Sequence, residues 1–535
     1  MPTTRWERTK KFFELESAST ERRSNEDLDP IPPNKRTWTF MHYAVFWVSD
    51  NLSVSGFRQA SSIMDVGLSW KMTLVVTAIG QTVQGLFITI CGIAGANYHV
   101  PFTIQSRASF GFYLSYLFIA MRCIVAIFWY GIQAYTGAEC VRTMLYAIWP
   151  SFHNVKNTIP EHENIDTQLM VAYVIYFLTC LPMHWVGVHR LRWFFLLKAI
   201  TTPFVSFALM IWTVKKAGVG NTSLFTSGNT IHGSALAWQF MSSLYSTIGG
   251  GTTLMVNAPD YSRFAPKPNH TMITILTIPV TSLVMAFLGV VVASGSAVIY
   301  GSIQWDPLIL MDNWTSKGGR AAAFFIAFSF YLSQLGLNIA ANSIASANDM
   351  NCMFPRYINI RRGQFISAFL GAWALTPWNI LTGAPAFLSF MSGYSVWLTP
   401  IAGIMISDYF FVHRGNYNVF ELYNSNGIYR FNKYGCNWRS WAAFTLAWVP
   451  LLPGFLPKVS TVVTTMNVGM EHLYDVGFFY GMPVSIISYY LLCKFFPAEE
   501  TMITSPVYAF VEDYSGTVTD PEQQLSETYE KNSME

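Results

Sequence analysis

Long apolar stretches recur along nearly the whole chain, with short polar segments between them. Most are long enough to cross a bilayer as an α-helix, which takes about 17–25 residues. We predict about twelve transmembrane helices, near residues 42–66, 72–96, 111–137, 167–186, 192–214, 236–257, 271–300, 321–347, 364–380, 382–411, 440–457 and 473–496. The pattern therefore predicts an all-α membrane protein.

Two of these stretches are interrupted in the middle. The first contains Asp50-Asn-Leu-Ser-Val-Ser-Gly56, and the sixth contains Ile248-Gly-Gly-Gly-Thr-Thr253. Unpaired backbone amides are costly in hydrocarbon, so such breaks persist only where they line a cavity or a binding site. Paired breaks in two halves of a chain indicate a secondary transporter. We therefore predict two inverted five-helix repeats with discontinuous spans 1 and 6, followed by two extra helices.

This architecture divides the chain into four regions. A polar N-terminal tail precedes a transport core, and a loop with the last two helices leads to an acidic C-terminal tail. We expect both tails to be plain solvated segments, with a regulatory role as the alternative. The predicted boundaries are 1–40 for the first tail, 41–412 for the core with repeats at about 41–230 and 231–412, 413–496 for the loop and last helices, and 497–535 for the second tail.

The composition excludes several other classes of protein. The chain is 52% hydrophobic and only 12% charged, against about a quarter charged in soluble domains. Basic residues gather in the N-terminal tail and in alternate loops, which predicts cytoplasmic termini and a multi-pass plasma-membrane protein. No soluble basic face predicts a nucleic-acid partner. No paired Cys or His spacing, phosphate-binding loop or nucleophile elbow predicts a metal, a cofactor or an enzyme.

Polar side chains inside the predicted spans are candidate site residues, because burying them in a bilayer is costly. In span 3, Trp129 and Gln133 lie one helical turn apart and suit a planar, hydrogen-bonding heterocycle. An interfacial Trp and a helix-packing Gln are the alternative. In span 8, Asn338, Asn342 and Ser346 follow one stripe, where each could bind a ligand or join neighbouring helices.

The ionisable residues fall into two groups. Asp50 and Glu139 are candidates for carrying a proton, and Arg58 could pair with either of them or bind an anionic substrate. The other charges stand at helix ends and indicate gate or anchoring ion pairs, because helix-end charges usually reach toward water. The predicted pairs are Asp260 with Arg263 and Asp349 with Arg356.

Several longer motifs resemble the nucleobase:cation symporter-1 family, most closely its fungal uracil, uridine and allantoin permease branch. They cover spans 1–10 and the tail in order. The motifs are Asn25-Glu-Asp-Leu-Asp-Pro-Ile-Pro-Pro-Asn-Lys-Arg-Thr-Trp38, Gly67-Leu-Ser-Trp70, Arg107-Ala-Ser-Phe-Gly111, Trp129-Tyr-Gly-Ile-Gln133, Asn257-Ala-Pro-Asp-Tyr-Ser-Arg263 and Phe354-Pro-Arg-Tyr-Ile-Asn-Ile-Arg-Arg-Gly363. The resemblance implies a leucine-transporter-like fold, alternating access and a heterocycle held between spans 1, 3, 6 and 8.

The same resemblance implies roles for individual residues. Trp129 matches the family's stacking Trp, and Gln133 and Asn342 match its amides. Ser53 falls where relatives place a longer polar ligand, and Gly250 and Gly251 fall where some relatives carry a bulky or charged residue. Both changes enlarge the predicted pocket and leave room for a substrate larger than uracil.

The family pattern also bears on the coupling ion. Sodium-coupled relatives supply two hydroxyls from span 8, where this chain has Gly336 and Leu337. These residues offer no side-chain oxygen to a hard cation, although Ser49 has one. A proton is therefore favoured over sodium as the co-transported ion.

Together these features predict a proton-coupled importer of a nucleobase-like heterocycle, such as uracil, allantoin, uric acid or a nucleoside. The alternative within the fold is a carrier of a vitamin cation, thiamine or nicotinamide riboside, with Asp50 as the carboxylate. A non-transporting nutrient sensor is the alternative of a different class. The predicted partners are the heterocycle, the proton and the lipid bilayer.

Overall fold

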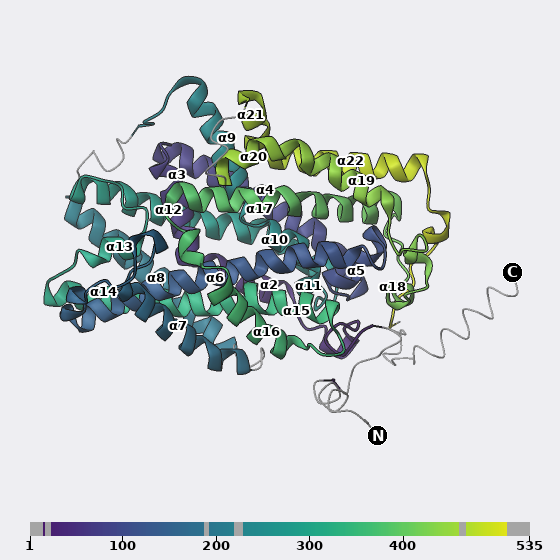
Figure 1. The fold of residues 1–535 in the computed structure, drawn as a ribbon, viewed down its shortest axis with the longest axis horizontal. Coiled ribbons are helices and arrows are strands. Elements are labelled where there is room, and N and C mark those ends of the chain that lie inside the picture. The colour runs from purple at the N-terminus through teal and green to yellow at the C-terminus, as the bar shows by residue number, and fades with distance from the viewer. Residues whose placement is uncertain (1–13, 16–22, 187–191, 219–227, 460–466, 511–535) are drawn as a thin grey trace, which may run out of the picture.

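The computed structural model describes residues 14–15, 23–186, 192–218, 228–459 and 467–510. Over these residues the chain is a bundle of long helices that run roughly parallel to the longest axis of the molecule (Figure 1). Nine of the described helices are long and apolar enough to cross a membrane. The three remaining predicted spans, 1, 6 and 9, consist of shorter helical pieces, which explains the difference from twelve.

The first predicted repeat contains spans 1–5 and a short helix that joins spans 2 and 3. Span 1 is divided into two helices, as its sequence predicts. The helices are α2 (Phe40–Asn51), α3 (Val54–Asp65), α4 (Trp70–Tyr98), α5 (Phe102–Phe110), α6 (Ser115–Ile148), α7 (Thr167–Trp185) and α8 (Arg192–Ala217).

The second predicted repeat contains spans 6–10, and span 6 is again divided. Three of its spans include π-helical turns, which form η7, η8 and η10. The elements are α9 (Gly233–Gly249), α10 (Thr252–Val256), α11 (Ala258–Ser262), α12 (Thr274–Tyr300), α13 (Pro307–Asp312), α14 (Lys317–Leu337), η7 (Asn338–Ser343), α15 (Ile344–Met353), α16 (Ile360–Phe369), η8 (Leu370–Ala374), α17 (Ala384–Ser407) and η10 (Asp408–Val412).

Equivalent members of the two repeats pack against each other. Span 2 (α4) contacts span 7 (α12), and span 3 (α6) contacts span 8 (α14). The two extra spans, formed by α19 with α20 and by α22, flank α17 at one side of the bundle (Figure 1). The helices after α17 are α18 (Val419–Tyr423), α19 (Trp438–Trp448), α20 (Leu452–Val459), α21 (Val468–Asp475) and α22 (Gly477–Phe495).

The described part of the N-terminal tail packs on the bundle, so the expectation of a solvated tail is wrong for this part. Asn25 and Leu28 are buried. The Asn25 side chain donates a hydrogen bond to Asn351 Oδ1 at 2.6 Å, and Leu28 accepts one through its carbonyl from the Tyr423 hydroxyl at 2.8 Å. The segment is polar in composition, but these contacts with residues far along the chain hold it against the bundle. Most of residues 1–22 and all of 511–535 lie outside the described residues.

Candidate functional site

The break in span 1 lies at Leu52 and Ser53, between α2 and α3. The Ser53 hydroxyl caps α3 by accepting a hydrogen bond from the backbone N–H of Gly56 at 3.4 Å. The Leu52 carbonyl accepts a hydrogen bond from the Ser333 hydroxyl of α14 at 2.9 Å. These side chains satisfy backbone groups that the break releases, as a non-helical segment at membrane depth requires.

The break in span 6 lies at Gly250 and Gly251, between α9 and α10. The glycines here allow neighbouring helices to approach closely. A Cβ atom at Gly249 would lie 2.5 Å from the Met391 carbonyl oxygen of α17, and one at Gly251 would lie 2.0 Å from Gln84 Cδ of α4. The glycine run therefore interrupts the helix and also makes room for α4 and α17.

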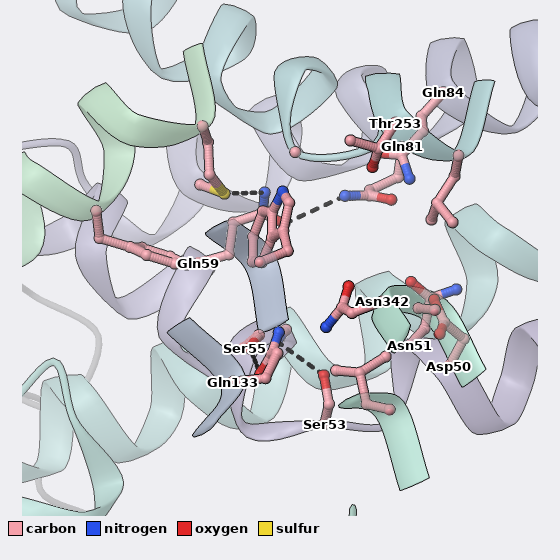
Figure 2. Close-up of a pocket in the computed structure, with 18 residues that line it drawn as sticks. Asp50, Asn51, Ser53, Ser55, Gln59, Gln81, Gln84, Gln133, Thr253 and Asn342 are labelled. Carbon is pink, nitrogen blue, oxygen red and sulfur yellow. Dashed lines mark hydrogen bonds between the residues drawn. The ribbon is translucent and has the colours of Figure 1, made fainter. Parts of the chain in front are cut away.

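A cavity of about 120 Å³ lies between the two breaks (Figure 2). Its walls come from spans 1, 2, 3, 6, 8 and 10. Six of the residues selected from the sequence line it, namely Asp50, Ser53, Trp129, Gln133, Gly250 and Asn342. Gly251 stands in the adjacent break, and Glu139 is not among the lining residues.

The flat wall of the cavity is the indole of Trp129 in α6. Two aromatic rings of α17 pack nearly perpendicular to it: Phe390, with ring centroids 5.4 Å apart, and Tyr394, at 6.1 Å. One turn along α6, Gln133 Oε1 accepts a hydrogen bond from the Ser55 hydroxyl at 3.1 Å. The helix thus presents a stacking surface and a carboxamide whose orientations are fixed by neighbours.

The three polar residues of span 8 have different surroundings. Asn338 donates to the Tyr130 carbonyl of α6 at 3.2 Å, and Ser346 bonds to Ser367 of α16 at 2.6 Å, so both join helices. Asn342 lies in the π-helical turn η7 and lines the cavity, and its amide donates to Asn338 Oδ1 at 3.1 Å. Single π-helical turns often occur at functional sites.

A second group of carboxamides lines the cavity, and the sequence analysis did not select it. It comprises Gln59 of α3 with Gln81 and Gln84 of α4. Gln81 donates to Gln59 Oε1 at 3.2 Å. Figure 2 places Gln81 and Gln84 beside Thr253, on a different side of the cavity from Gln133 and Ser53. The sequence feature that could have predicted this group is a pair of glutamines, three residues apart, inside an apolar span.

Asp50, near the end of α2, interacts electrostatically with Lys198 of α8, which is buried in the bundle. The two residues are not among the ion pairs within 4 Å of the described part of the chain. A buried carboxylate is stabilised by an opposite charge close to it. In the sequence, Lys198 is a single lysine inside an apolar span, and no pattern there connects it with Asp50.

Arg58 lies outside the cavity, in a buried ion triad. Its Nη2 atom donates to Glu139 Oε2 of α6 at 2.6 Å and to Asp306 Oδ2 at 2.5 Å, and Nη1 donates to the Thr136 hydroxyl at 2.8 Å. Asp306 caps α13. Of the alternatives left open for Arg58, the structure supports pairing with Glu139, and it adds Asp306 as an unpredicted partner.

Asp349 and Arg356 do not pair with each other, contrary to the prediction. The partner of Asp349 is Arg122 of α6, whose Nε donates to Asp349 Oδ2 at 2.6 Å and whose Nη2 donates to the Ala345 carbonyl at 2.5 Å. Arg356 follows α15, is 46% exposed and pairs with Glu14 at 2.8 Å. Because α15 packs against α6, Arg122 lies closer to Asp349 than Arg356 does, although Arg356 is only seven positions along the chain.

The predicted pair of Asp260 and Arg263 is likewise absent from the ion pairs of the described residues. Asp260 Oδ1 accepts a hydrogen bond from the backbone N–H of Phe102 at 2.9 Å. Arg263 donates to the Asp27 carbonyl of the N-terminal segment at 2.9 Å. Both residues anchor the end of span 6, but each binds a different neighbouring segment.

The sequence matches the family model described as permease for cytosine/purines, uracil, thiamine, allantoin over residues 30–481. The chain belongs to this permease family. The match spans both predicted repeats and confirms the resemblance to the nucleobase:cation symporter-1 family. Membership of a permease family also agrees with the prediction that the chain is not an enzyme.

Relatives of the permease family and a solved structure match nearly the full length of the chain. An uncharacterized permease of Schizosaccharomyces pombe is 40% identical over 494 residues, covering 92% of this chain and 88% of that protein. The allantoin permease of Saccharomyces cerevisiae is 34% identical and covers 92% and 80%. The inward-facing structure of Mhp1 aligns with a TM-score of 0.70 at 20% identity, covering 91% and 96%. The structural match confirms the predicted leucine-transporter-like fold.

Replacing Arg122 by Met in this permease is expected to lower its stability strongly. The substitution leaves the Asp349 carboxylate buried without a counter-charge, which typically costs about 3–5 kcal/mol. We expect a lower midpoint of thermal unfolding for the detergent-solubilised protein. Arg356→Met is the matched control, because it removes a more exposed pair worth about 0–1 kcal/mol. Equal effects of the two substitutions would contradict the assignment of Arg122 as the partner.

Proposed function

We propose that this permease imports a nucleobase-like heterocycle together with a proton by alternating access. Uracil, allantoin, uric acid and nucleosides are the candidate substrates. The observation that carries the proposal is the cavity between the paired breaks, where Trp129, Gln133 and Asn342 lie together. Substrate sites of transporters with inverted repeats lie at such breaks.

The cavity has the chemistry that a planar amide-containing ring requires. The Trp129 indole offers a face for stacking. The carboxamides of Gln133 and Asn342 each carry a donor and an acceptor, which match the alternating N–H and C=O groups along the edge of such a ring. The Ser53 hydroxyl at the span 1 break adds a third hydrogen-bonding group. Gly250 contributes no side chain and leaves space for the ring.

A vitamin cation such as thiamine is a weaker candidate, although the family description includes thiamine. A cation would favour a carboxylate in the cavity. Among the described residues that line it, Asp50 is the one acidic residue, and the buried Lys198 ammonium interacts with it electrostatically. Since this interaction partly offsets the charge of Asp50, the site favours ligands without a positive charge.

Two observations support a proton rather than sodium. Gly336 and Leu337 supply no side-chain oxygen. The triad of Arg58, Glu139 and Asp306 contains two carboxylates for one guanidinium, and all three side chains are at most 9% exposed. One proton would neutralise the excess charge.

Charged groups around this triad also bear on its titration. Arg142 lies one turn along α6 from Glu139 and pairs with Asp312 of α13 at 3.6 Å and with Asp166 at 4.0 Å. Burial raises the pKa of Asp312 to about 6, against the opposing effect of Arg142. The triad and these neighbours form one acidic cluster, which supports a coupling site at the α13 end.

The orientation of the protein follows from the same proposal. The basic N-terminal tail and the loops near α5 and α18 would face the cytoplasm of a cell whose plasma membrane contains the transporter. The α13 end, at the opposite end of the bundle in Figure 1, would face outward. A non-transporting nutrient sensor would not need an acid for proton coupling. The presence of Glu139 with its buried partners therefore favours transport.

Uptake in transporter-deficient cells at acidic pH tests the proposal. Labelled uracil, uridine, allantoin, thiamine and nicotinamide riboside are supplied in parallel. We expect saturable uptake of at least one neutral compound, acidification of the cytoplasm during uptake, and no effect of sodium removal. Uptake of a vitamin cation alone would favour the alternative, and loss of uptake without sodium would refute proton coupling. Binding without uptake would support a sensor.

A further inference from the structure

Gln84 of α4 is a buried polar residue whose role the proposed site leaves unexplained. Its side chain is 5% exposed and lines the cavity, yet its Oε1 atom accepts no hydrogen bond from any described residue. Leaving a buried acceptor unpaired costs about 1–3 kcal/mol. An acceptor at this position therefore requires a role other than stabilising the fold.

The neighbouring carboxamides already have partners in the protein. Gln81 donates to Gln59 and accepts a hydrogen bond from the Ser282 hydroxyl at 3.2 Å. The Gln59 amide in turn lies 3.8 Å from Met391 Sδ, as a weak donor. These contacts fix two of the three carboxamides, whereas the Oε1 atom of Gln84 has no hydrogen-bond partner among the described residues.

Access to Gln84 depends on the glycine at the second position of the span 6 break. A Cβ atom at Gly251 would lie 2.0 Å from Gln84 Cδ and 2.2 Å from Nε2, so any other residue would displace this carboxamide. At Gly250 the nearest atom to an added Cβ is Met391 Sδ at 3.2 Å, which is a milder contact. Gly251 therefore allows the Gln84 side chain to occupy its position at the cavity wall.

We propose that Gln84 forms a second substrate subsite, which binds an N–H or O–H group attached to the heterocyclic ring. The inference rests on the proposed function, in which Trp129 and Gln133 hold the ring itself. It assigns the substrate to neutral heterocycles with a hydrogen-bond-donating substituent, such as a ureido group or a ribose. A bare ring would occupy the Trp129 side and leave Gln84 unpaired.

Matched pairs of ligands test this assignment. Allantoin is hydantoin with an added ureido group, and uridine is uracil with an added ribose, so each pair differs only in the substituent. The inhibition constants of all four compounds are measured against the transported substrate in cells that express the full chain. We expect the substituted member of at least one pair to bind about tenfold more tightly than its bare ring.

Gln84→Met removes the carboxamide and keeps a side chain of similar length. We expect this variant to lose about tenfold affinity for the substituted ligand only, with the bare ring unchanged. Gly251→Ala should have the same selective effect, because its Cβ atom would displace the Gln84 carboxamide. Equal losses for both members of a pair in Gln84→Met, or no loss for either, would overturn the subsite.

Failure of this inference is distinguishable from failure of the proposed function. If Gln84→Met has no selective effect but Gln133→Met weakens both members of a pair, the ring site holds and the subsite is wrong. If the wild-type protein binds none of the four compounds, the proposed substrate class itself is wrong. The amount of protein at the cell surface is measured for each variant, so that a folding defect is not counted as a binding effect.

Discussion

Replacing Trp129 by Ala is expected to reduce uptake by about 100-fold while the protein still reaches the cell surface. Stacking of a base on an aromatic side chain is worth about 1–3 kcal/mol, and the upper end of that range corresponds to this loss. The side chain lines the cavity and is 9% exposed. Replacing it removes the flat wall of the cavity and breaks no ion pair between the helices of the bundle. Uptake of labelled substrate at several concentrations, normalised to surface protein, measures the effect.

Trp129→Phe serves as the matched control. Phenylalanine keeps an aromatic face packed against Phe390 and Tyr394 and should retain most of the transport, with a loss of about fivefold. An Ala variant with wild-type affinity would remove Trp129 from the binding site. A Phe variant as inactive as the Ala variant would show that the indole contributes more than a stacking surface.

The spans and their two breaks were predictable because the bilayer imposes a simple rule on the sequence. A crossing helix needs a long apolar run, and a polar or glycine-rich interruption at that depth needs a cavity. The breaks at Leu52–Ser53 and Gly250–Gly251 fall inside the segments that the sequence marked. Helical spacing also placed Trp129 and Gln133 on one face, where both line the cavity.

The partners of charged residues were not predictable from spacing along one helix. Arg122 and Asp349 are 227 positions apart, and Arg58 and Asp306 are 248 apart. Sequence gives the depth of each charge in the membrane, but the helix that faces it follows from the packing of the bundle. The prediction therefore paired charges that were close in sequence, and the two helix-end pairs were wrong.

The carboxamides of α4 were missed for a related reason. Gln81 and Gln84 stand in an uninterrupted apolar helix, whereas the sequence pattern predicts ligands only in the two interrupted spans and in spans 3 and 8. Their importance arises from the opposite repeat, because the glycines of span 6 leave the space that Gln84 fills. A glycine run predicts the break but not the side chain that lies against it.

Replacing Glu139 by Gln is expected to abolish proton coupling without destabilising the fold. The amide can still accept the hydrogen bond from Arg58, and the triad becomes a neutral pair of Arg58 and Asp306. The site then has no excess negative charge for a proton to neutralise. We expect any remaining uptake to be independent of external pH and to cause no cytoplasmic acidification, which intracellular pH recording during uptake measures.

Arg58→Met is the contrasting substitution, because it changes the same triad in the opposite direction. It leaves Glu139 and Asp306 buried without their guanidinium, at a cost of about 3–5 kcal/mol. Because acid neutralises both carboxylates, this variant should unfold at a lower temperature at neutral pH and recover part of its stability at acidic pH. Unfolding midpoints across a pH series check this result. If uptake by Glu139→Gln kept the wild-type pH dependence, the coupling proton would have to bind elsewhere, and Asp50 with Lys198 would be the next pair to test.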